Sequence, residues 1–383
     1  MDNGKKPRVL IFSLAYFPFI GGAEIAVKEI TDRLGDRFDF DLITYKFKKE
    51  WSDLEKIGNV NVYRVRSINK FFFVFKAYFL AEKLSKKNSY SVVWSIMAAY
   101  AGFSALFFKF FNPKIPFLLT LQEGDSEEYI LKRVGFFHPF WRLIFKKADH
   151  IQAISNFLAD FGRRHGARCP ISVISNGVDI KKFLISNFQF LNKSTNSNFK
   201  TIITTSRLVH KNGIDILIRA ASELKKSQVS DFRFRILILG DGPEHEKLQI
   251  LAQNLGVQDE VIFIGHIEPD KIPEYLYQAD IFVRPSRSEG LGNSFLEAMA
   301  AGLPVIGTPV GGIPDFLKDG ETGIFCEPDN PKDLANKVEL LFEDKNLSNN
   351  LSANGKKLVF EKYSWDKIAL EISDILNKLC VYY

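Results

Sequence analysis

The chain is poor in the residues that build disulfide frameworks and structural zinc sites. It holds three cysteines, which are far apart and outside any Cys-x-x-Cys pattern: Cys169, Cys326 and Cys380. An odd number of scattered cysteines predicts neither a disulfide scaffold nor a zinc site. The six histidines are also scattered without metal-ligand spacing. We therefore expect a protein of a reducing compartment, the cytoplasm, without a bound metal.

Long apolar runs are missing as well. No segment reaches the roughly 18 uninterrupted apolar residues that a membrane span requires. The apolar stretch from Val9 to Ile20 follows a short basic segment and superficially resembles a signal peptide. However, it contains Ser13 and Pro18 and lacks a small-x-small cleavage site. We interpret it as a buried first strand.

Length and charge divide the chain into two parts. At 383 residues it exceeds one ordinary core and predicts two domains. Residues 1–180 carry 27 Lys and Arg against 18 Asp and Glu, a balance of +9, whereas the remaining residues carry 24 against 27, a balance of −3. A basic first half indicates an anionic partner, such as a membrane surface, a phosphate-bearing acceptor or nucleic acid. A solvated Lys-rich surface is the alternative.

Short β-branched or aromatic runs alternate with segments of helical period in both halves. This alternation predicts crossover units around largely parallel sheets, and hence two doubly wound α/β domains. Ligands of such domains bind beyond the carboxyl ends of the strands. The polar segment 181–198 breaks the rhythm and is the predicted linker. The predicted strands are 8–15, 40–44, 60–65, 92–96, 117–121, 150–154, 171–174, 201–205, 234–239, 261–264, 281–284 and 304–307.

A glycine-rich bend joins two carboxylates in the second half. Glu289 and Glu297 flank Gly-Leu-Gly-Asn-Ser-Phe-Leu, and the second of them lies on a short predicted helix that ends at Gly302. The amide groups of a first helical turn form an anion site, and carboxylates accept hydrogen bonds from sugar hydroxyls. The arrangement suits a nucleotide sugar, which has hydroxyls at both ends and a diphosphate between them.

Other loops of the second half follow predicted strands. Arg207 and Lys211 stand four residues apart before a helix, and two cations beside a helix terminus suit a diphosphate. Gly240-Asp241-Gly242-Pro243 is a tight turn that starts a helix. Gly311-Gly312 supplies backbone freedom where a ligand could approach, or is only a turn.

These motifs together resemble retaining glycosyltransferases of family GT4. The resemblance rests on Glu289 to Glu297 with seven residues between, on Ser206-Arg207-Leu208 with Lys211-Asn212-Gly213, on Gly240 to Pro243, on Ser175-Asn176-Gly177-Val178-Asp179 and on Gly21-Gly22-Ala23-Glu24. It covers essentially the whole chain in the same order.

The resemblance implies a GT-B fold of two Rossmann-like domains. Residues 1–180 would bind the acceptor, residues 199–364 the nucleotide sugar, and residues 365–383 would form a helix that returns to the first domain. By carry-over from the family, catalytic roles fall to Glu289, which would contact the donor hexose, and to Arg207 and Lys211, which would neutralise the diphosphate. Glu297 would hold the ribose hydroxyls. Further donor contacts are expected at Gly292, Asn293, Ser294, Phe295, Gly21, Gly22, Gly265 and Ile267.

The implied mechanism is front-face transfer with retention of configuration. A donor phosphate oxygen would receive the acceptor proton, and Glu289 as a covalent nucleophile is the alternative. Preorganised cations can replace a divalent metal at the leaving diphosphate, so neither a metal nor another cofactor is expected. The triplet Asp39-Phe40-Asp41, which would bind manganese in another glycosyltransferase fold, begins a strand far from these loops.

The acceptor side departs from the family pattern. Where many members have a histidine, this chain has Gln122, which cannot titrate near neutral pH. Glu123 and Asp125 are nearby carboxylates that either contribute to acceptor specificity or form an exposed polar turn.

An aromatic run from Phe71 to Leu80, followed by Lys83, Lys86 and Lys87, is apolar almost all round. Such a helix is either buried in a core or lies in a membrane interface. With the basic first half, this makes peripheral docking on an anionic membrane a hypothesis.

The predicted protein is thus a hexosyltransferase that uses a nucleotide sugar and a glycan or lipid-linked acceptor, in cell-surface polysaccharide or glycolipid synthesis, without a nucleic-acid partner. The alternatives are a phosphorylase-like relative and a non-enzymatic sugar-nucleotide binder. GDP-mannose, UDP-glucose and UDP-N-acetylglucosamine all stay open as donors.

Overall fold

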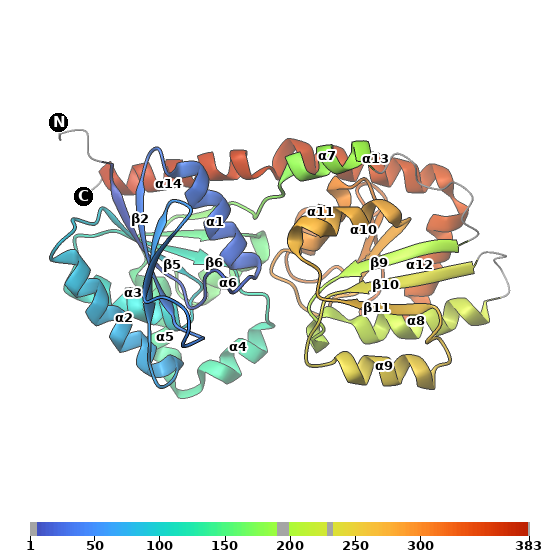
Figure 1. Ribbon diagram of the computed structural model, residues 1–383, viewed down its shortest axis with the longest axis horizontal. Coiled ribbons are helices and arrows are strands. Elements are labelled where there is room, and N and C mark those ends of the chain that lie inside the picture. Colours follow the sequence, from blue (N-terminus) through green and yellow to red (C-terminus); the bar gives the residue numbers. More distant parts are fainter. Residues whose placement is uncertain (1–5, 190–198, 228–232, 382–383) are drawn as a thin grey trace. The chain divides into compact units, whose positions relative to one another are not determined.

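The computed structural model describes residues 6–189, 199–227 and 233–381. They divide into two compact units, the first made of residues 1–176 and 365–383 and the second of residues 177–364. Figure 1 shows that each unit is a twisted sheet covered by helices. Both units are α/β domains with parallel sheets, as the alternation of strand and helix predicts.

The first unit is built on an eight-stranded sheet in the order β3-β4-β2-β1-β5-β6-β7-β8. All neighbours in it are parallel except β3 and β4, which form an antiparallel edge pair. The strands are β1 (Arg8–Phe12), β2 (Asp39–Tyr45), β3 (Leu54–Ile57), β4 (Val60–Val65), β5 (Val92–Ile96), β6 (Phe117–Leu121), β7 (His150–Ala153) and β8 (Ile171–Val173).

Helices cover this sheet and complete its core. The last helix of the chain packs against the first, and its apolar side joins the core formed by β1, β2 and β5. The helices are α1 (Gly22–Leu34), α2 (Lys70–Ser85), α3 (Tyr100–Phe111), α4 (Glu127–Val134), α5 (His138–Lys147), α6 (Asn156–Arg164) and α14 (Trp365–Val381), with a 3-10 turn, η1 (Gly135–Phe137), before α5.

The second unit is a six-stranded parallel sheet in the order β11-β10-β9-β12-β13-β14. The order reverses next to β9, which is where doubly wound sheets open a crevice for ligands. The strands are β9 (Phe199–Thr205), β10 (Arg233–Leu239), β11 (Val261–Gly265), β12 (Ile281–Arg284), β13 (Val305–Gly307) and β14 (Ile324–Phe325).

Its helices form a second apolar core with these strands. None of the helices in the described residues is both long and apolar enough to cross a membrane. The helices are α7 (Ile180–Gln189), α8 (Ile214–Lys226), α9 (His245–Asn254), α10 (Ile272–Gln278), α11 (Asn293–Ala300), α12 (Pro331–Glu343) and α13 (Lys345–Lys362).

The structure differs from the sequence prediction at the expected linker. Residues 181–189 belong to helix α7, and residues 190–198 lie outside the described residues. Two contacts explain the helix. The Asp179 carboxylate accepts a hydrogen bond from the amide of Lys181. Phe183 is buried, and its carbonyl accepts a hydrogen bond from the hydroxyl of Tyr277 on α10. A local contact and a tertiary one therefore support a helix in a segment whose own pattern is weak.

Candidate functional site

The loops after β9, β10, β12 and β13 meet at the carboxyl edge of the second sheet. Glycines allow them to approach one another closely. A Cβ at Gly240 would lie 2.0 Å from the carbonyl oxygen of Ser206, and one at Gly242 would lie 2.4 Å from that of Leu208. The turn from Gly240 to Gly242 therefore rests directly on the backbone that carries Arg207. Only glycine fits there.

The segment from Glu289 to Glu297 forms the bend and helix that its sequence predicts. Gly292 is left-handed with φ of 105° and stands just before α11, whose first turn holds Asn293, Ser294 and Phe295. The amide of Phe295 already donates a hydrogen bond to the carbonyl of Gly292, at 2.9 Å. The amide for which an anion contact is predicted therefore makes a hydrogen bond within the turn.

Glu289 is fixed from both sides. One carboxylate oxygen accepts a hydrogen bond from Arg284 Nη2 at 2.5 Å, and the other accepts one from the amide of Gly290 at 3.2 Å. Its own carbonyl accepts a hydrogen bond from the amide of Gly312 at 3.1 Å. Gly311 has φ of 56°, and a Cβ there would lie 1.8 Å from the same carbonyl. The Gly311-Gly312 loop thus positions Glu289, in addition to forming a turn.

Arg284, the last residue of β12, is the centre of this arrangement and was missed by the sequence analysis. Its side chain is buried and donates hydrogen bonds to Ser294 Oγ at 2.7 Å, to Asn212 Oδ1 at 2.9 Å and to Glu289. We call these four residues the Arg284 network. The available signal was the charge itself, because Arg284 closes a strand whose other residues are all apolar.

Asn212 extends this network to the predicted diphosphate loop. Its side-chain amide donates a hydrogen bond to the carbonyl of Arg207 at 2.6 Å, while its oxygen accepts one from Arg284. Arg207 itself is exposed and Lys211 is half-buried. The structure therefore connects Arg207 and Glu289, which are 82 positions apart in the sequence, through the two side chains between them.

Glu297 lies in the second turn of α11. Burial raises the pKa of its carboxyl group to about 7, against the opposing effect of Lys182 and Arg284. Within the described residues its carboxylate makes no hydrogen bond. It is therefore a half-buried acceptor that a ligand hydroxyl could satisfy.

The predicted base-binding residues lie farther along the same edge. Gly265 ends β11 with φ of 82° and accepts a hydrogen bond from the amide of Gly240 at 2.8 Å. Ile267, two residues on, is half-buried. Strands β11 and β12 are separated by β10 and β9, which places Gly265 about 14 Å from the end of β12. A ligand that reached both would have to be elongated.

In the first unit, Gly21 stands just before helix α1 and Gly22 begins it. The carboxyl group of Glu24, in the first turn, lies close to Gly21, because a Cβ at Gly21 would lie 2.5 Å from one of its oxygens. Burial raises its pKa to about 7. A carboxyl group therefore stands beside the helix terminus that is predicted to approach the donor phosphate or the acceptor.

The predicted acceptor loop follows β6. Gln122 accepts a hydrogen bond from the side chain of Asn176 at 3.2 Å, and Asp125 is half-buried. Glu123 points inward: one oxygen accepts a hydrogen bond from the amide of Ala98 at 2.7 Å, and the other is buried and unpartnered within the described residues. Burial raises its pKa to about 7. An exposed polar turn is therefore wrong for Glu123.

Family models match both units of the chain. Residues 20–182 match the model of glycosyltransferase family 4, and residues 187–358 match glycosyl transferases group 1. The matched ranges contain the Arg284 network and the predicted donor and acceptor loops. The chain belongs to glycosyltransferase family 4.

Relatives span this glycosyltransferase to different extents. An uncharacterised glycosyltransferase of Methanocaldococcus jannaschii is 28% identical over 377 residues, covering 97% of this chain and 98% of its own. A GDP-mannose-dependent alpha-(1-6)-phosphatidylinositol monomannoside mannosyltransferase of Mycobacterium tuberculosis is 29% identical over 240 residues, 60% of this chain and 62% of its own.

Solved structures share the fold. Sucrose-phosphate synthase of Thermosynechococcus elongatus superposes with a TM-score of 0.83 at 21% identity, covering 99% of this chain and all of the other. HepE of Anabaena, solved with UDP and glucose, gives 0.77 at 20% identity over 97% of this chain and all of its own. The fold of this glycosyltransferase is therefore the GT-B fold.

In this glycosyltransferase the carboxylates of the Asp39-Phe40-Asp41 triplet accept hydrogen bonds from side chains of the first unit. Arg8 donates hydrogen bonds to Asp39 at 3.1 Å and to Asp41 at 3.5 Å, and the hydroxyl of Tyr90 donates to Asp41 at 2.7 Å. Among the described residues, no group of three or more His, Cys, Asp or Glu side chains could hold a metal ion.

Proposed function

We propose that this glycosyltransferase moves a hexose, with retention of configuration, from a nucleotide diphosphate sugar to a hydroxyl of a glycan or lipid-linked acceptor. The observation that carries the proposal is the Arg284 network. It holds Glu289, the first turn of α11 and the backbone of Arg207 at one edge of the second sheet. A hexose would find a fixed partner in Glu289, and a diphosphate would lie between the first turn of α11 and the loop that carries Arg207.

Each group has a role that its chemistry supports. The half-buried carboxylate of Glu297 would accept hydrogen bonds from the ribose hydroxyls, and Glu289 would accept them from the hexose. Arg207 and Lys211 would stabilise the charge that develops on the leaving diphosphate. The two cations and the helix amides would supply the stabilisation that a metal supplies elsewhere, so we propose transfer without a metal.

The contacts of Glu289 favour front-face transfer over a covalent intermediate. Its carboxylate is paired with Arg284, and an ion-paired carboxylate is a poor nucleophile. In the proposed step the bond between the anomeric carbon and the phosphate oxygen breaks, and the acceptor oxygen bonds to the same face of that carbon. The acceptor proton passes to a phosphate oxygen, which leaves with the nucleoside diphosphate.

A thermal-shift screen tests the donor site. The purified protein is heated with UDP, GDP, ADP and their sugars, because a ligand that binds only the folded state raises the melting temperature. We expect one nucleotide to raise it selectively, and Glu297→Gln to abolish the shift. Glu246→Gln, a change of an exposed carboxylate on α9, is the matched control.

The outcome also separates the alternatives. A shift without sugar transfer to any acceptor would indicate a non-enzymatic sugar-nucleotide binder. Absorbance of a lysine-bound pyridoxal phosphate in the pure protein would indicate a phosphorylase-like relative. No shift with any nucleotide would contradict the proposed donor site.

We further propose that the enzyme works at an anionic membrane surface. Helix α2 buries Phe73, Val74 and Ala77 in the core but exposes its other side. An aromatic face results, in which ring contacts join Phe71 to Phe137, Phe75 to Phe107 and Tyr78 to Phe111. Its exposed members are Phe71, Phe72, Phe75, Phe79, Phe110, Phe111, Phe136, Phe137 and Phe140.

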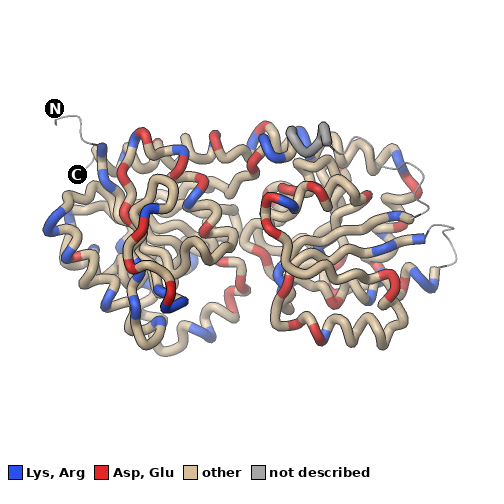
Figure 2. The backbone as a smooth tube through the Cα atoms, viewed as in Figure 1, with Lys and Arg blue, Asp and Glu red and all other residues tan. Residues whose placement is uncertain are grey.

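Basic residues accompany the aromatic face. Between residues 66 and 88 the sequence holds six Lys or Arg and one acidic residue, Glu82. Figure 2 shows Lys and Arg along α2. Exposed phenylalanines among lysines match an anionic bilayer, whose interface accepts aromatic rings and attracts cations. A lipid-linked acceptor would be found at such a surface.

Binding to liposomes tests this location. We expect cosedimentation with vesicles of anionic lipid, weakened by high salt. Reversal of charge at Lys83, Lys86 and Lys87 should release the protein. The matched control reverses Lys226, Lys247 and Lys332, which are exposed lysines of the second unit. Equal binding by the two triple variants would contradict the proposal.

A further inference from the structure

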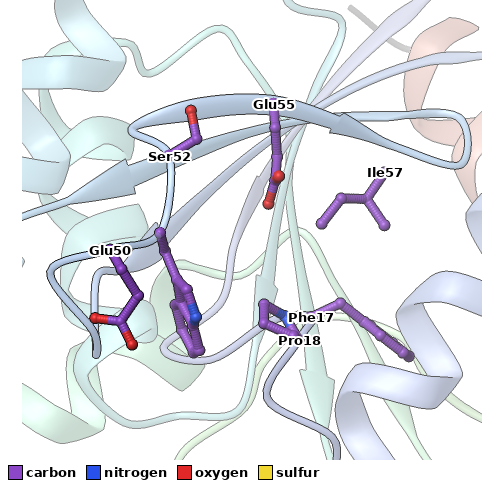
Figure 3. Close-up of a pocket in the computed structure, with 7 residues that line it drawn as sticks. Phe17, Pro18, Glu50, Ser52, Glu55 and Ile57 are labelled. Atoms are coloured by element: carbon purple, nitrogen blue, oxygen red, sulfur yellow. The ribbon is translucent and has the colours of Figure 1, made fainter.

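A pocket of about 410 Å³ lies beside the edge strand β3 of the first sheet and extends to the loops at the carboxyl ends of β1 and β2. The loop after β1 contributes Phe17 and Pro18, the loop after β2 contributes Glu50, Trp51 and Ser52, and β3 completes it. Figure 3 shows the labelled side chains arranged around one space. The loops that follow β1 and β2 stand at the carboxyl ends of their strands, where ligands of parallel α/β sheets bind.

The walls of this Trp51 pocket combine two kinds of surface. Trp51, Pro18 and Ile57 are apolar, whereas Glu50 and Glu55 are carboxylates. A pyranose ring has the complementary pattern, with C–H groups on its faces and hydroxyl donors around its rim. Carboxylates accept hydrogen bonds from hydroxyls and repel phosphate. Arg64 offsets the charge of Glu55, so the remaining negative charge of Glu50 disfavours a phosphate and the walls suit a neutral sugar.

Arg64 contacts several residues that line the pocket. It is buried and donates hydrogen bonds to the carbonyls of Phe17 at 2.7 Å and Ser52 at 3.1 Å, and it pairs with the carboxylate of Glu55. Its guanidinium group also lies 5.5 Å from the centre of the Trp51 ring. One cation thus fixes both loops and the ring before any ligand arrives, which lowers the entropic cost of binding.

We propose that the Trp51 pocket is an acceptor subsite that binds a neutral pyranose unit of the glycan acceptor. The proposal rests on the glycosyltransferase function proposed above and names the chemistry of its acceptor. The loop that lines the pocket runs directly into Gly21 and helix α1. Trp51 provides a platform for one face of the sugar, and Glu50 and Glu55 accept hydrogen bonds from its hydroxyls.

Fluorescence can report on this pocket directly. Of the four tryptophans, Trp94, Trp141 and Trp365 are buried, with 1%, 1% and 3% of their surface exposed, whereas Trp51 is half-buried. Quenching by acrylamide therefore reports chiefly on Trp51. We expect the methyl α-glycosides of mannose, glucose and N-acetylglucosamine, tested one by one, to include one that saturably protects the fluorescence. The protected signal should disappear in Trp51→Phe.

Substitutions of Trp51 then distinguish a loss of glycoside binding from a loss of the fluorescence signal. Saturation-transfer NMR of the same glycoside should persist in Trp51→Phe, which keeps an aromatic ring, and weaken about tenfold in Trp51→Ala. Tyr129→Ala, which removes an exposed ring on α4, outside both the pocket and the aromatic face, should leave it unchanged. In transfer assays Trp51→Ala should raise the KM for the acceptor and leave the KM for the donor unchanged.

Two failures are distinguishable. If nucleotides raise the melting temperature but none of the glycosides binds, or if Trp51→Ala binds them as well as the parent protein, the subsite is refuted and the donor site stands. If no nucleotide binds, the proposed function itself has failed.

Discussion

Each unit contains a buried arginine near the carboxyl end of a strand, Arg284 in the second unit and Arg64 in the first. Arg284 donates to the side chains of Asn212, Ser294 and Glu289, and so fixes polar groups that a ligand can touch. Arg64 donates mainly to backbone carbonyls, and so fixes the shape of two loops. The comparison shows that a buried arginine can fix either the polar side chains of a charged site or the backbone of the loops around a pocket.

Removal of Arg284 should have the largest effect. Arg284→Met leaves Glu289 without its partner in a buried setting, which should lower the free energy of unfolding by about 3 to 5 kcal/mol and abolish turnover. Arg284→Lys should recover part of the stability but little activity, because one ammonium cannot reach three acceptors. Urea denaturation and initial rates measure both, with the exposed Arg219→Met on α8 as control. Wild-type stability in Arg284→Met would refute the network.

Arg207 should separate catalysis from stability. Because its side chain is exposed, Arg207→Ala should leave urea denaturation unchanged. It should nevertheless lower kcat/KM by a factor that corresponds to about 2 to 4 kcal/mol, the usual cost of losing a donor that stabilises transition-state charge. Arg219→Ala is again the matched control. Full activity at subsaturating donor would show that the diphosphate binds elsewhere.

Arg64 provides the converse test. Arg64→Met should leave the carbonyls of Phe17 and Ser52 without donors and lower the free energy of unfolding by about 2 to 3 kcal/mol. Trp51 should become more accessible to acrylamide, while the KM for the donor stays unchanged. An altered donor KM would contradict a division of labour between the two arginines.

Gly311 and Gly320 form a matched pair that isolates backbone contact. Both have positive φ, 56° and 73°, but only at Gly311 would a Cβ collide, with the carbonyl of Glu289. Gly320→Ala should cost about 1 kcal/mol and spare activity. Gly311→Ala should cost more and reduce turnover, because Glu289 has to move. Equal effects on rate would mean that this contact does not position Glu289.

Glu297 should give the smallest effect, on the pH dependence of stability. Its pKa is raised to about 7 in the folded protein from an ordinary value near 4.5, so the folded state holds a proton that the unfolded state releases. The free energy of unfolding should therefore fall as pH rises from about 4.5 to 7. Glu24 and Glu123 contribute in the same direction.

Denaturation of the unliganded protein and of Glu297→Gln at pH 5 and pH 8 isolates the contribution of Glu297 to the free energy of unfolding. Relative to the parent protein, Glu297→Gln should gain on the order of 1 to 2 kcal/mol at pH 8, because it carries no charge to bury. At pH 5 the two should be nearly equal. A parallel pH dependence in both proteins would place Glu297 in a more polar setting than described.

The sequence predicts the Glu289–Glu297 segment of the second unit well because its motif is local, whereas it misses strand β14. The spacing of Glu289 and Glu297 and the glycines between them specify a bend and a helix, and the structure has both. Arg284 escapes such reasoning, because its partners lie 72, 5 and 10 positions away and only the fold brings them together. The roles of these residues toward a donor stay predictions.

In the first unit the sequence predicts the parallel strands but not the edge. Strand β3 has the half-exposed, charged pattern of an edge, which a single short window cannot distinguish from a loop. The Trp51 pocket is formed by that strand and by two separate loops, so no linear sequence motif predicts it. Likewise Glu123 reads as part of a polar turn, and only the amide of Ala98 accounts for its inward direction.

The order of synthesis gives α14 a further significance. Its apolar residues, among them Trp365, Ile368 and Ile372, belong to the core of the first unit, and Arg33 of α1 pairs with Asp366 at 2.6 Å. On the ribosome, the first 176 residues therefore emerge without the helix that completes their core. The second unit, residues 177–364, emerges uninterrupted and can fold before the first unit is finished. A nascent chain stalled before Trp365 would thus present one finished unit and one with an open apolar side.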